Sequence, residues 1–345
     1  MRLSAVQRAL QLAVCFWLVA VVSGAAQDVH VLVSPDVKTG KDGTAEFPTI
    51  KMALDHHPLA GLGSDGKPGR VFIEIEPGVY HERVIVTQNH TNVTLLGKGK
   101  SPQDVVITNS LNAKTAGGTF FTETVDINGN GFQADNITFE NAAGNTGQAV
   151  AVAVRADRVV FKHCRFLGHQ DTLFADYGRQ YYADSYIEGG VDFIFGNAAA
   201  VFDRAEIHAL APGYLTAQSR TSAAQATGFV IANSRVTSGI AVSDAAAGKT
   251  TSLGRPWRSY SRVVFLNTEL AADVVPAGWS AWDKQKNPET TFYAEYQSRG
   301  PGARVAERVA WSHQLTAAEA KQFEPEAFLA GSDAWNAVAE ARKLP

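Results

Sequence analysis

Residues 168–196 read GHQDTLFADYGRQYYADSYIEGGVDFIFG, a series of short β-forming runs separated by glycines and polar turns. Two aspartates in it, Asp171 and Asp192, stand 21 residues apart among uncharged and aromatic neighbours. The runs have the length of strands and lack the periodicity of a helix. The spacing of the aspartates has structural meaning only if the chain repeats with about that period.

The surrounding sequence does repeat. Asp135, Asp157 and Asp203 each precede a β-rich run and are spaced by 22 and 46 residues, close to one and two repeats. Such a period favours a solenoid of parallel strands in which each coil stacks on the one before. A β-sandwich is the alternative, since it also joins short strands by turns. The expected strands are Val29–Ser34, Val71–Ile75, Val84–Val86, Val93–Leu96, Val105–Ile107, Ile137–Phe139, Val159–Phe161, Val201–Phe202, Phe229–Ile231 and Val263–Leu266.

The ends of the chain differ from this pattern. Residues 1–26 contain two arginines, an apolar run of about 13 residues and then small residues, which predicts a secretory signal peptide. A membrane anchor would need roughly 20 apolar residues, and no later segment is long and apolar enough to span a bilayer. We therefore expect one domain, residues 27–345, that is secreted or periplasmic. Pro48–His57 and Thr316–Phe323 are expected helices that could cap or cover the stack.

Composition argues against several classes of protein. The formal charge of −3 becomes −5 without the two arginines of the leader, and a nucleic-acid binder would show a basic excess. Only Cys164 remains in the mature chain, so no internal disulfide can form, and we expect a buried packing residue there. The nine histidines show no metal-ligand spacing, and the Gly-x-Ser-x-Gly motif of serine hydrolases is missing from the sequence.

A solenoid would gather polar side chains from successive coils. Gln148, Gln170 and Asp192 are spaced by 22 residues each, so adjacent coils about 4.8 Å apart would align them. Asp171 follows Gln170 directly. Two close carboxylates cannot both ionise easily, which would leave one as nucleophile or base and the other as acid. Polar side chains aligned in this way could also have a purely structural role, in which they only hydrogen-bond to one another. Arg255, between a glycine and a proline, could hold a carboxylate through two hydrogen bonds or make a surface salt bridge.

Aromatic residues surround the two aspartates. They could form a cleft that stacks on sugar rings, or they could belong to the core. At strand spacing the core is the default for Phe193 and Phe195. The full set is Phe174, Tyr177, Tyr181, Tyr182, Phe193 and Phe195.

Four ordered motifs resemble those of the pectin methylesterases, also called pectinesterases. They are GQAVA at 147–151, GHQDTL at 168–173, GVDFIFG at 190–196 and LGRPW at 253–257. The resemblance implies an all-β fold, a right-handed parallel β-helix with short capping or peripheral helices, and an activity without metal or other cofactor. It also implies hydrolysis of the methyl esters of galacturonate units in pectin, which releases methanol and acidic pectin.

Carried over residue by residue, the resemblance implies that Asp192 is the nucleophile and Asp171 the general acid and then base. Gln148 and Gln170 would stabilise the oxyanion, and Arg255 would orient Asp192. Contacts with the substrate are expected from Gln148, Arg255, Trp257, Thr119 and Phe193.

Other interpretations remain open at this point. A polygalacturonase would use carboxylates to cleave the glycosidic bond, and a pectin lyase would need clustered acids around calcium. A non-catalytic solenoid could bind polysaccharide alone. The preferred interpretation is a monomer whose partner is methyl-esterified pectin, with no nucleic acid and no membrane contact after removal of the signal.

Overall fold

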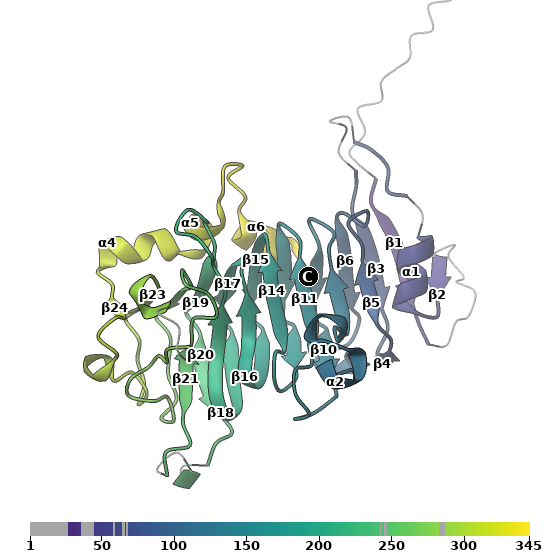
Figure 1. The fold of residues 1–345 in the computed structure, drawn as a ribbon. Coiled ribbons are helices and arrows are strands. Elements are labelled where there is room, and N and C mark those ends of the chain that lie inside the picture. The colour runs from purple at the N-terminus through teal and green to yellow at the C-terminus, as the bar shows by residue number, and fades with distance from the viewer. Residues whose placement is uncertain are drawn as a thin grey trace, which may run out of the picture.

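The chain winds into an elongated stack of parallel strands (Figure 1). The computed structural model describes residues 27–35, 45–57, 59–63, 66, 68–241, 243–244, 247–282 and 287–345. The predicted signal peptide, residues 1–26, lies outside them. Every pairing between named strands is parallel, which makes the β-sandwich interpretation wrong and confirms the right-handed parallel β-helix.

One face of the stack is a single parallel sheet. Inward and outward side chains alternate along its strands, and the inward ones are aliphatic or aromatic. Its strands, in spatial order, are β2 (Ala45–Phe47), β1 (Val29–Val33), β3 (Val71–Ile75), β6 (Val93–Gly97), β9 (Gln133–Asp135), β12 (Val159–Lys162), β15 (Arg179–Ala183), β17 (Ala199–Asp203), β19 (Gly228–Ala232), β22 (Arg262–Leu266), β23 (Phe292–Tyr296) and β24 (His313–Gln314).

The other strands form two further faces that share their longest members. β16 (Tyr186–Gly196) and β18 (Glu206–Gln218) begin on one face and end on the other, with register shifts between Gly189 and Ile194. The first of these faces contains β4 (Gly78–His81), β7 (Val105–Asn109), β10 (Thr138–Asn141), β13 (Arg165–Leu167) and β20 (Arg235–Ser238). The second contains β5 (Val84–Val86), β8 (Val125–Ile127), β11 (Val152–Arg155), β14 (Leu173–Tyr177) and β21 (Thr251–Gly254).

Successive coils turn in the same way at the corner that follows the sheet containing β9, β12 and β15. One residue there adopts the left-handed conformation, with φ between 49° and 59°, which polar residues such as Asn and Asp tolerate best. Because Asn136 occupies this corner, β10 begins at Thr138 and not at the predicted Ile137. The corner residues are Asn136, His163, Asp184, Arg204, Asn233, Asn267 and Gln297.

The interior is filled by side chains stacked from coil to coil. Phe161, Tyr182 and Phe202 are fully buried, and their rings stack with centroids 5.0 Å and 4.7 Å apart. Cys164 is a free, buried thiol beside them, and burial raises its pKa well above the ordinary value, which agrees with the packing role expected for it. Repetition of apolar positions at the coil period therefore builds one continuous core.

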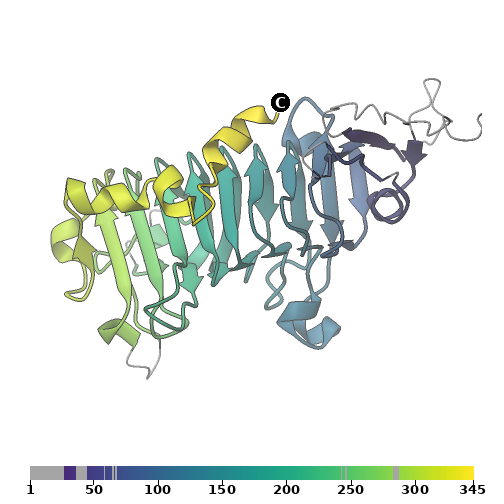
Figure 2. The same ribbon diagram turned by 90° about the horizontal axis from the view of Figure 1, so that it is seen from above.

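Short helices lie at the ends and along one side. α1 begins at Ile50, not Pro48, because the Thr49 hydroxyl accepts a hydrogen bond from Met52 N at 3.1 Å and caps it. The helix expected at Thr316–Phe323 is present as α4 followed by a 3₁₀ turn, with the predicted capping box formed. In Figure 2 the C-terminal helices run across the sheet that contains β12, β15 and β17. The helices and 3₁₀ turns are α1 (Ile50–His56), η1 (Pro102–Asp104), α2 (Ala113–Ala116), η2 (Thr119–Phe121), η3 (Asn287–Glu289), η4 (Val305–Glu307), α4 (Ala317–Ala320), η5 (Lys321–Phe323), α5 (Pro325–Leu329) and α6 (Ala337–Lys343).

In the described part of the chain, no helix has the length and apolar character needed to cross a membrane.

Candidate active site

A pocket of about 310 Å³ on the face that carries β11, β14 and β21 brings most of the predicted site residues together. A larger hollow of about 1010 Å³ runs along the corner residues, and none of the predicted site residues lines it. The smaller pocket is therefore the candidate site. Its lining residues are Thr119, Phe120, Gln148, Gln170, Asp171, Asp192, Phe195, Ala217, Arg255, Trp257 and Trp282.

The stacking of coils places the two aspartates side by side. Gln170 pairs with Val191, and Leu173 pairs with Ile194, so the register is offset by 21 residues here. Asp171 consequently lies beside Asp192 in the adjacent coil. The predicted alignment of Gln170 with Asp192 at a 22-residue period is wrong by one position, because this part of the coil is one residue shorter.

Both aspartates have unusual backbones. The φ angles of Asp171 and Asp192 are 63° and 51°, in the left-handed region that non-glycine residues rarely occupy. Asp192 lies within β16 where the register with β18 shifts, so the strand is locally interrupted at this residue. Local strain of this kind is common where a fold fixes functional side chains.

Arg255 holds the Asp192 carboxylate through two hydrogen bonds. Nε donates to Oδ1 at 2.9 Å and Nη2 donates to Oδ2 at 2.6 Å, the bidentate geometry that the sequence left as one of two options. The guanidinium lies over the rings of both Tyr214 and Trp282, with Cζ 4.0 and 4.1 Å from their centroids. Sequence reasoning missed both rings. Tyr214 pairs with Val191 across a shift in register between β16 and β18, so a constant period does not predict its place, and no local motif marks Trp282.

The two carboxyl groups differ in their affinity for protons. Burial, together with the charge of Asp192, raises the pKa of Asp171 to about 8. Burial also raises the pKa of Asp192, but the hydrogen bonds and charge of Arg255 oppose that rise. The sequence predicts that one of the two carboxyl groups keeps its proton, and these directions of shift favour Asp171 as the protonated partner.

The two glutamines lie on consecutive coils beside the aspartates. Gln148 and Gln170 form a parallel bridge, and the N–H of Ala149 donates to the carbonyl of Gln170 at 3.0 Å. Within the described residues, neither side-chain amide has a hydrogen-bond partner. Both amides are therefore available as donors to a molecule in the pocket.

Aromatic rings form a row along the pocket. Phe174 stacks on Phe195 at 4.6 Å and lies 4.9 Å from Phe120, while Phe195 is 6.0 Å from Trp257. Phe195 thus faces the pocket, although core was the default for it. Phe193 does belong to the core: its side chain is fully buried in the interior, so its predicted contact with substrate is wrong.

Thr119 lines the pocket as expected for a substrate contact. The other aromatics near the aspartates divide between core and surface. Tyr181 and Tyr182 are fully buried, whereas Tyr177 is 65% exposed. Among the described residues, no group of three His, Cys, Asp or Glu side chains is arranged to hold a metal ion.

This arrangement suits acyl transfer. Asp192 is a positioned carboxylate, and Asp171 is a neighbouring carboxyl group that retains its proton near neutral pH. Two amide donors lie next to both of them. A nucleophile, an acid and an oxyanion site are the parts needed to hydrolyse an ester through a covalent intermediate.

The profile of the Pectinesterase family matches residues 36–332. The chain belongs to the pectinesterase family. Pectinesterase 3 of Citrus sinensis is 40% identical over 309 residues, which cover 87% of this chain and 52% of the citrus protein, so the chain spans about half the length of that relative.

Solved pectinesterase structures share the fold. A pectin methylesterase from carrot is 36% identical, covers 94% of this chain and 98% of its own, and superposes with a TM-score of 0.80. A pectin methylesterase in complex with a hexasaccharide is 29% identical, covers 89% of this chain and 97% of its own, and gives a TM-score of 0.70. Membership of the pectinesterase family thus agrees with the four motifs and with the β-helix.

Proposed function

We propose that this protein is a carboxylic ester hydrolase that removes methyl esters from the galacturonate units of pectin. The observation that carries the proposal is the Asp192 carboxylate held by Arg255 beside Asp171, whose pKa is raised to about 8. Membership of the pectinesterase family, and the hexasaccharide bound to a related pectin methylesterase, support pectin as the substrate.

The first half of the reaction forms an acyl-enzyme. Ionised Asp192 attacks the carbonyl carbon of the methyl ester, and the amides of Gln148 and Gln170 donate to the oxyanion that develops. The tetrahedral intermediate then collapses: its bond to the methoxy group breaks, and Asp171 gives its proton to the departing methanol. An anhydride between Asp192 and the galacturonate carboxyl group remains.

The second half restores the enzyme. Asp171, now ionised, removes a proton from a water molecule that attacks the carbonyl carbon of the galacturonate acyl group. The bond to Asp192 breaks, which releases the acidic sugar unit and regenerates the Asp192 carboxylate under Arg255. Trp257 and Thr119 are assigned to contacts with the sugar chain, because both line the pocket.

Replacement Asp192→Ala tests the assignment. We expect methanol release from methylated pectin to fall by a factor of about 10⁴ or more, because the covalent step is lost. Circular dichroism should show an unchanged fold. Asp184→Ala, at an exposed corner outside the pocket, is the control and should keep full activity. Near-normal turnover by Asp192→Ala would disprove the role of Asp192.

The same assay separates related chemistries. An esterase releases methanol without shortening the polysaccharide, whereas a polygalacturonase or a lyase would shorten it. We further propose that residues 1–26 direct export and that the mature protein acts as a monomer, secreted or in the periplasm. N-terminal sequencing of the exported protein and its mass in solution test these two statements.

A further inference from the structure

The Gln148 side chain needs support from its backbone. It follows a loop, residues 142–147, that contains no strand, and its amide has no partner among the described residues. An oxyanion donor works only if it points in the right direction before charge develops. The conformation of residues 148–150 must therefore set the direction of the amide.

Main-chain bonds hold one side of this segment. The carbonyl of Gln148 accepts a hydrogen bond from Ala113 N at 2.8 Å, at the start of α2. The N–H of Ala149 donates to the carbonyl of Gln170 at 3.0 Å. These bonds tie the segment to the next coil and to α2. At Val150 the carbonyl also accepts a main-chain hydrogen bond from Thr124 N at 3.1 Å, but among the described residues no main-chain carbonyl accepts a hydrogen bond from the Val150 N–H.

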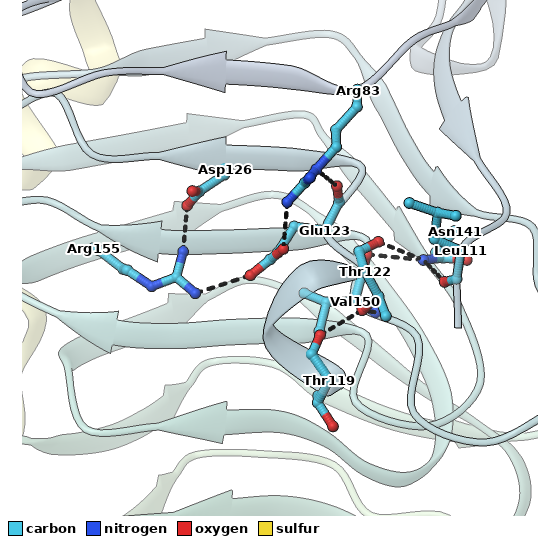
Figure 3. Close-up of polar contacts among 9 residues, drawn as sticks. All are labelled: Arg83, Leu111, Thr119, Thr122, Glu123, Asp126, Asn141, Val150 and Arg155. Carbon is cyan, nitrogen blue, oxygen red and sulfur yellow. Dashed lines mark hydrogen bonds and ion pairs between the residues drawn. The ribbon is translucent and has the colours of Figure 1, made fainter. Parts of the chain in front are cut away.

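Side chains supply the remaining support at Val150, as Figure 3 shows. The hydroxyl of Thr122 accepts from Val150 N at 2.9 Å and donates to the carbonyl of Thr119, in the pocket wall, at 2.7 Å. Asn141 Nδ2 lies 3.0 Å from Val150 O, 3.1 Å from Thr122 O and 2.9 Å from Leu111 O. Thr122, Val150 and Asn141 are at most 2% exposed, so water cannot replace these partners.

The neighbour of Thr122 is anchored as well. The Glu123 carboxylate, 1% exposed, pairs with Arg83 at 3.0 Å and with Arg155 at 2.9 Å (Figure 3). Arg155 also lies under the ring of Phe174 at 5.2 Å. The main chain at Thr122 is therefore a fixed point, and the segment bonded to it takes its position from there.

We propose that Thr122 is a positioning residue for catalysis, whose hydroxyl fixes the segment that aims the Gln148 amide at the oxyanion, with Asn141 securing the same junction. The inference rests on the proposed function, because it requires Gln148 to be an oxyanion donor. It assigns a role in the reaction to a buried residue that the substrate never touches.

A double-mutant cycle tests the proposal. Thr122→Val keeps the shape but removes the hydroxyl, and methanol release from methylated pectin should show kcat lowered about 10- to 100-fold with a much smaller change in KM. In a Gln148→Ala background the same replacement should change kcat less than about 3-fold, since the amide that Thr122 aims is gone. Thr122→Ser, which keeps the hydroxyl, should restore kcat.

Thr268→Val is the matched control. Thr268 is also fully buried, and its hydroxyl lies 3.1 Å from Ile231 O and 3.0 Å from Leu266 O, away from the pocket. It should lower the melting temperature and leave kcat unchanged. If Thr122→Val does not fold, Thr122→Ala replaces it in the cycle.

Two results would overturn the inference: equal loss of kcat in both backgrounds, or no rescue by Thr122→Ser. Full activity of Gln148→Ala alone would instead remove the oxyanion role of Gln148 from the proposed function. The single and double variants therefore distinguish a failure of the inference from a failure of the function on which it rests.

Discussion

At the scale of single residues, burial and the contact with one arginine give two aspartates different affinities for protons. Asp171 and Asp192 share a register position on adjacent coils, and the Asp192 carboxylate receives two hydrogen bonds from Arg255. Burial and the charge of Asp192 raise the pKa of Asp171 to about 8, although the charge of Arg255 opposes the rise. The proposed acid and the proposed nucleophile therefore differ in their neighbours, although both are aspartates.

The pH dependence of activity should follow from this division. Asp171 must carry its proton to serve as the acid, so kcat/KM should be high below about pH 8 and fall as pH rises through that value. At low pH, protonation of Asp192 should remove the nucleophile and lower kcat/KM again. Initial rates of methanol release between pH 4 and 10 would show this bell shape. A rate that keeps rising through pH 10, with the fold intact, would contradict the assignment of Asp171.

At the scale of elements, close approach of β21 to β18 sets the position of Arg255. Gly254 pairs with Thr216, and the N–H of Arg255 donates to Thr216 O at 2.9 Å. A Cβ atom on Gly254 would lie 2.0 Å from Thr216 Oγ1 and 2.8 Å from Thr216 O. The strand can come this near only because residue 254 has no side chain.

Gly254→Ala should therefore damage the site through the backbone. The added methyl group forces the end of β21 away from β18 and moves the guanidinium off Asp192, so kcat should fall about 10-fold or more. The free energy of unfolding should fall by about 1–3 kcal/mol. Gly78→Ala is the control, because the nearest atoms to its Cβ would be 3.5 Å away. Activity equal to the wild type for Gly254→Ala would show that β21 can shift without cost.

The sequence predicted the strands more completely than the residues around the pocket. β3 and β5 have the predicted bounds, since apolar runs between clear turns define a strand locally. Phe120, Tyr214 and Trp282 were missed, although all three lie against the site. Their places depend on loops and bulges of irregular length, and no period in the sequence encodes those.

The two aspartates of the candidate site show how far a period in the sequence can predict a contact. Their motifs and near-regular spacing predicted that they would meet, and they do. The one-residue error in the alignment of Gln170 with Asp192 came from assuming a constant period. The expected substrate contact of Phe193 came from the family resemblance, whereas strand spacing had favoured the core position that Phe193 occupies. Whether a side chain points inward or outward changes with every residue along a strand, so such a slip reverses its environment.

At the scale of the whole molecule, the C-terminal helices and the candidate site lie on different faces of the stack. The C-terminal helices cover the face that contains β12, β15 and β17, whereas the pocket lies on the face of β11, β14 and β21. Leu329 on α5 is fully buried in the cluster under these helices. Weakening this contact should affect folding more than chemistry.

Leu329→Ala should thus lower the free energy of unfolding by about 2–5 kcal/mol through the cavity it leaves. The kcat of the folded protein should stay within about 2-fold of the wild type, because α5 packs against β17, α6 and η5, away from the face of the pocket. Urea unfolding and methanol release at low temperature measure the two effects. Leu59→Ala, at a side chain 89% exposed, is the control and should change neither. A large loss of kcat with unchanged stability would contradict the separation of faces.

The corner residues with left-handed φ give the stack a further property. Because one corner residue ends the first face in coil after coil, each turn of the chain closes in the same way whatever the length of the loop that follows. Loops on the far side can therefore lengthen or shorten during evolution without disturbing how the coils stack. Changes in the loops around the pocket would then leave the positions of the two aspartates unchanged. Substrate preference could change in this way while the reaction stays the same.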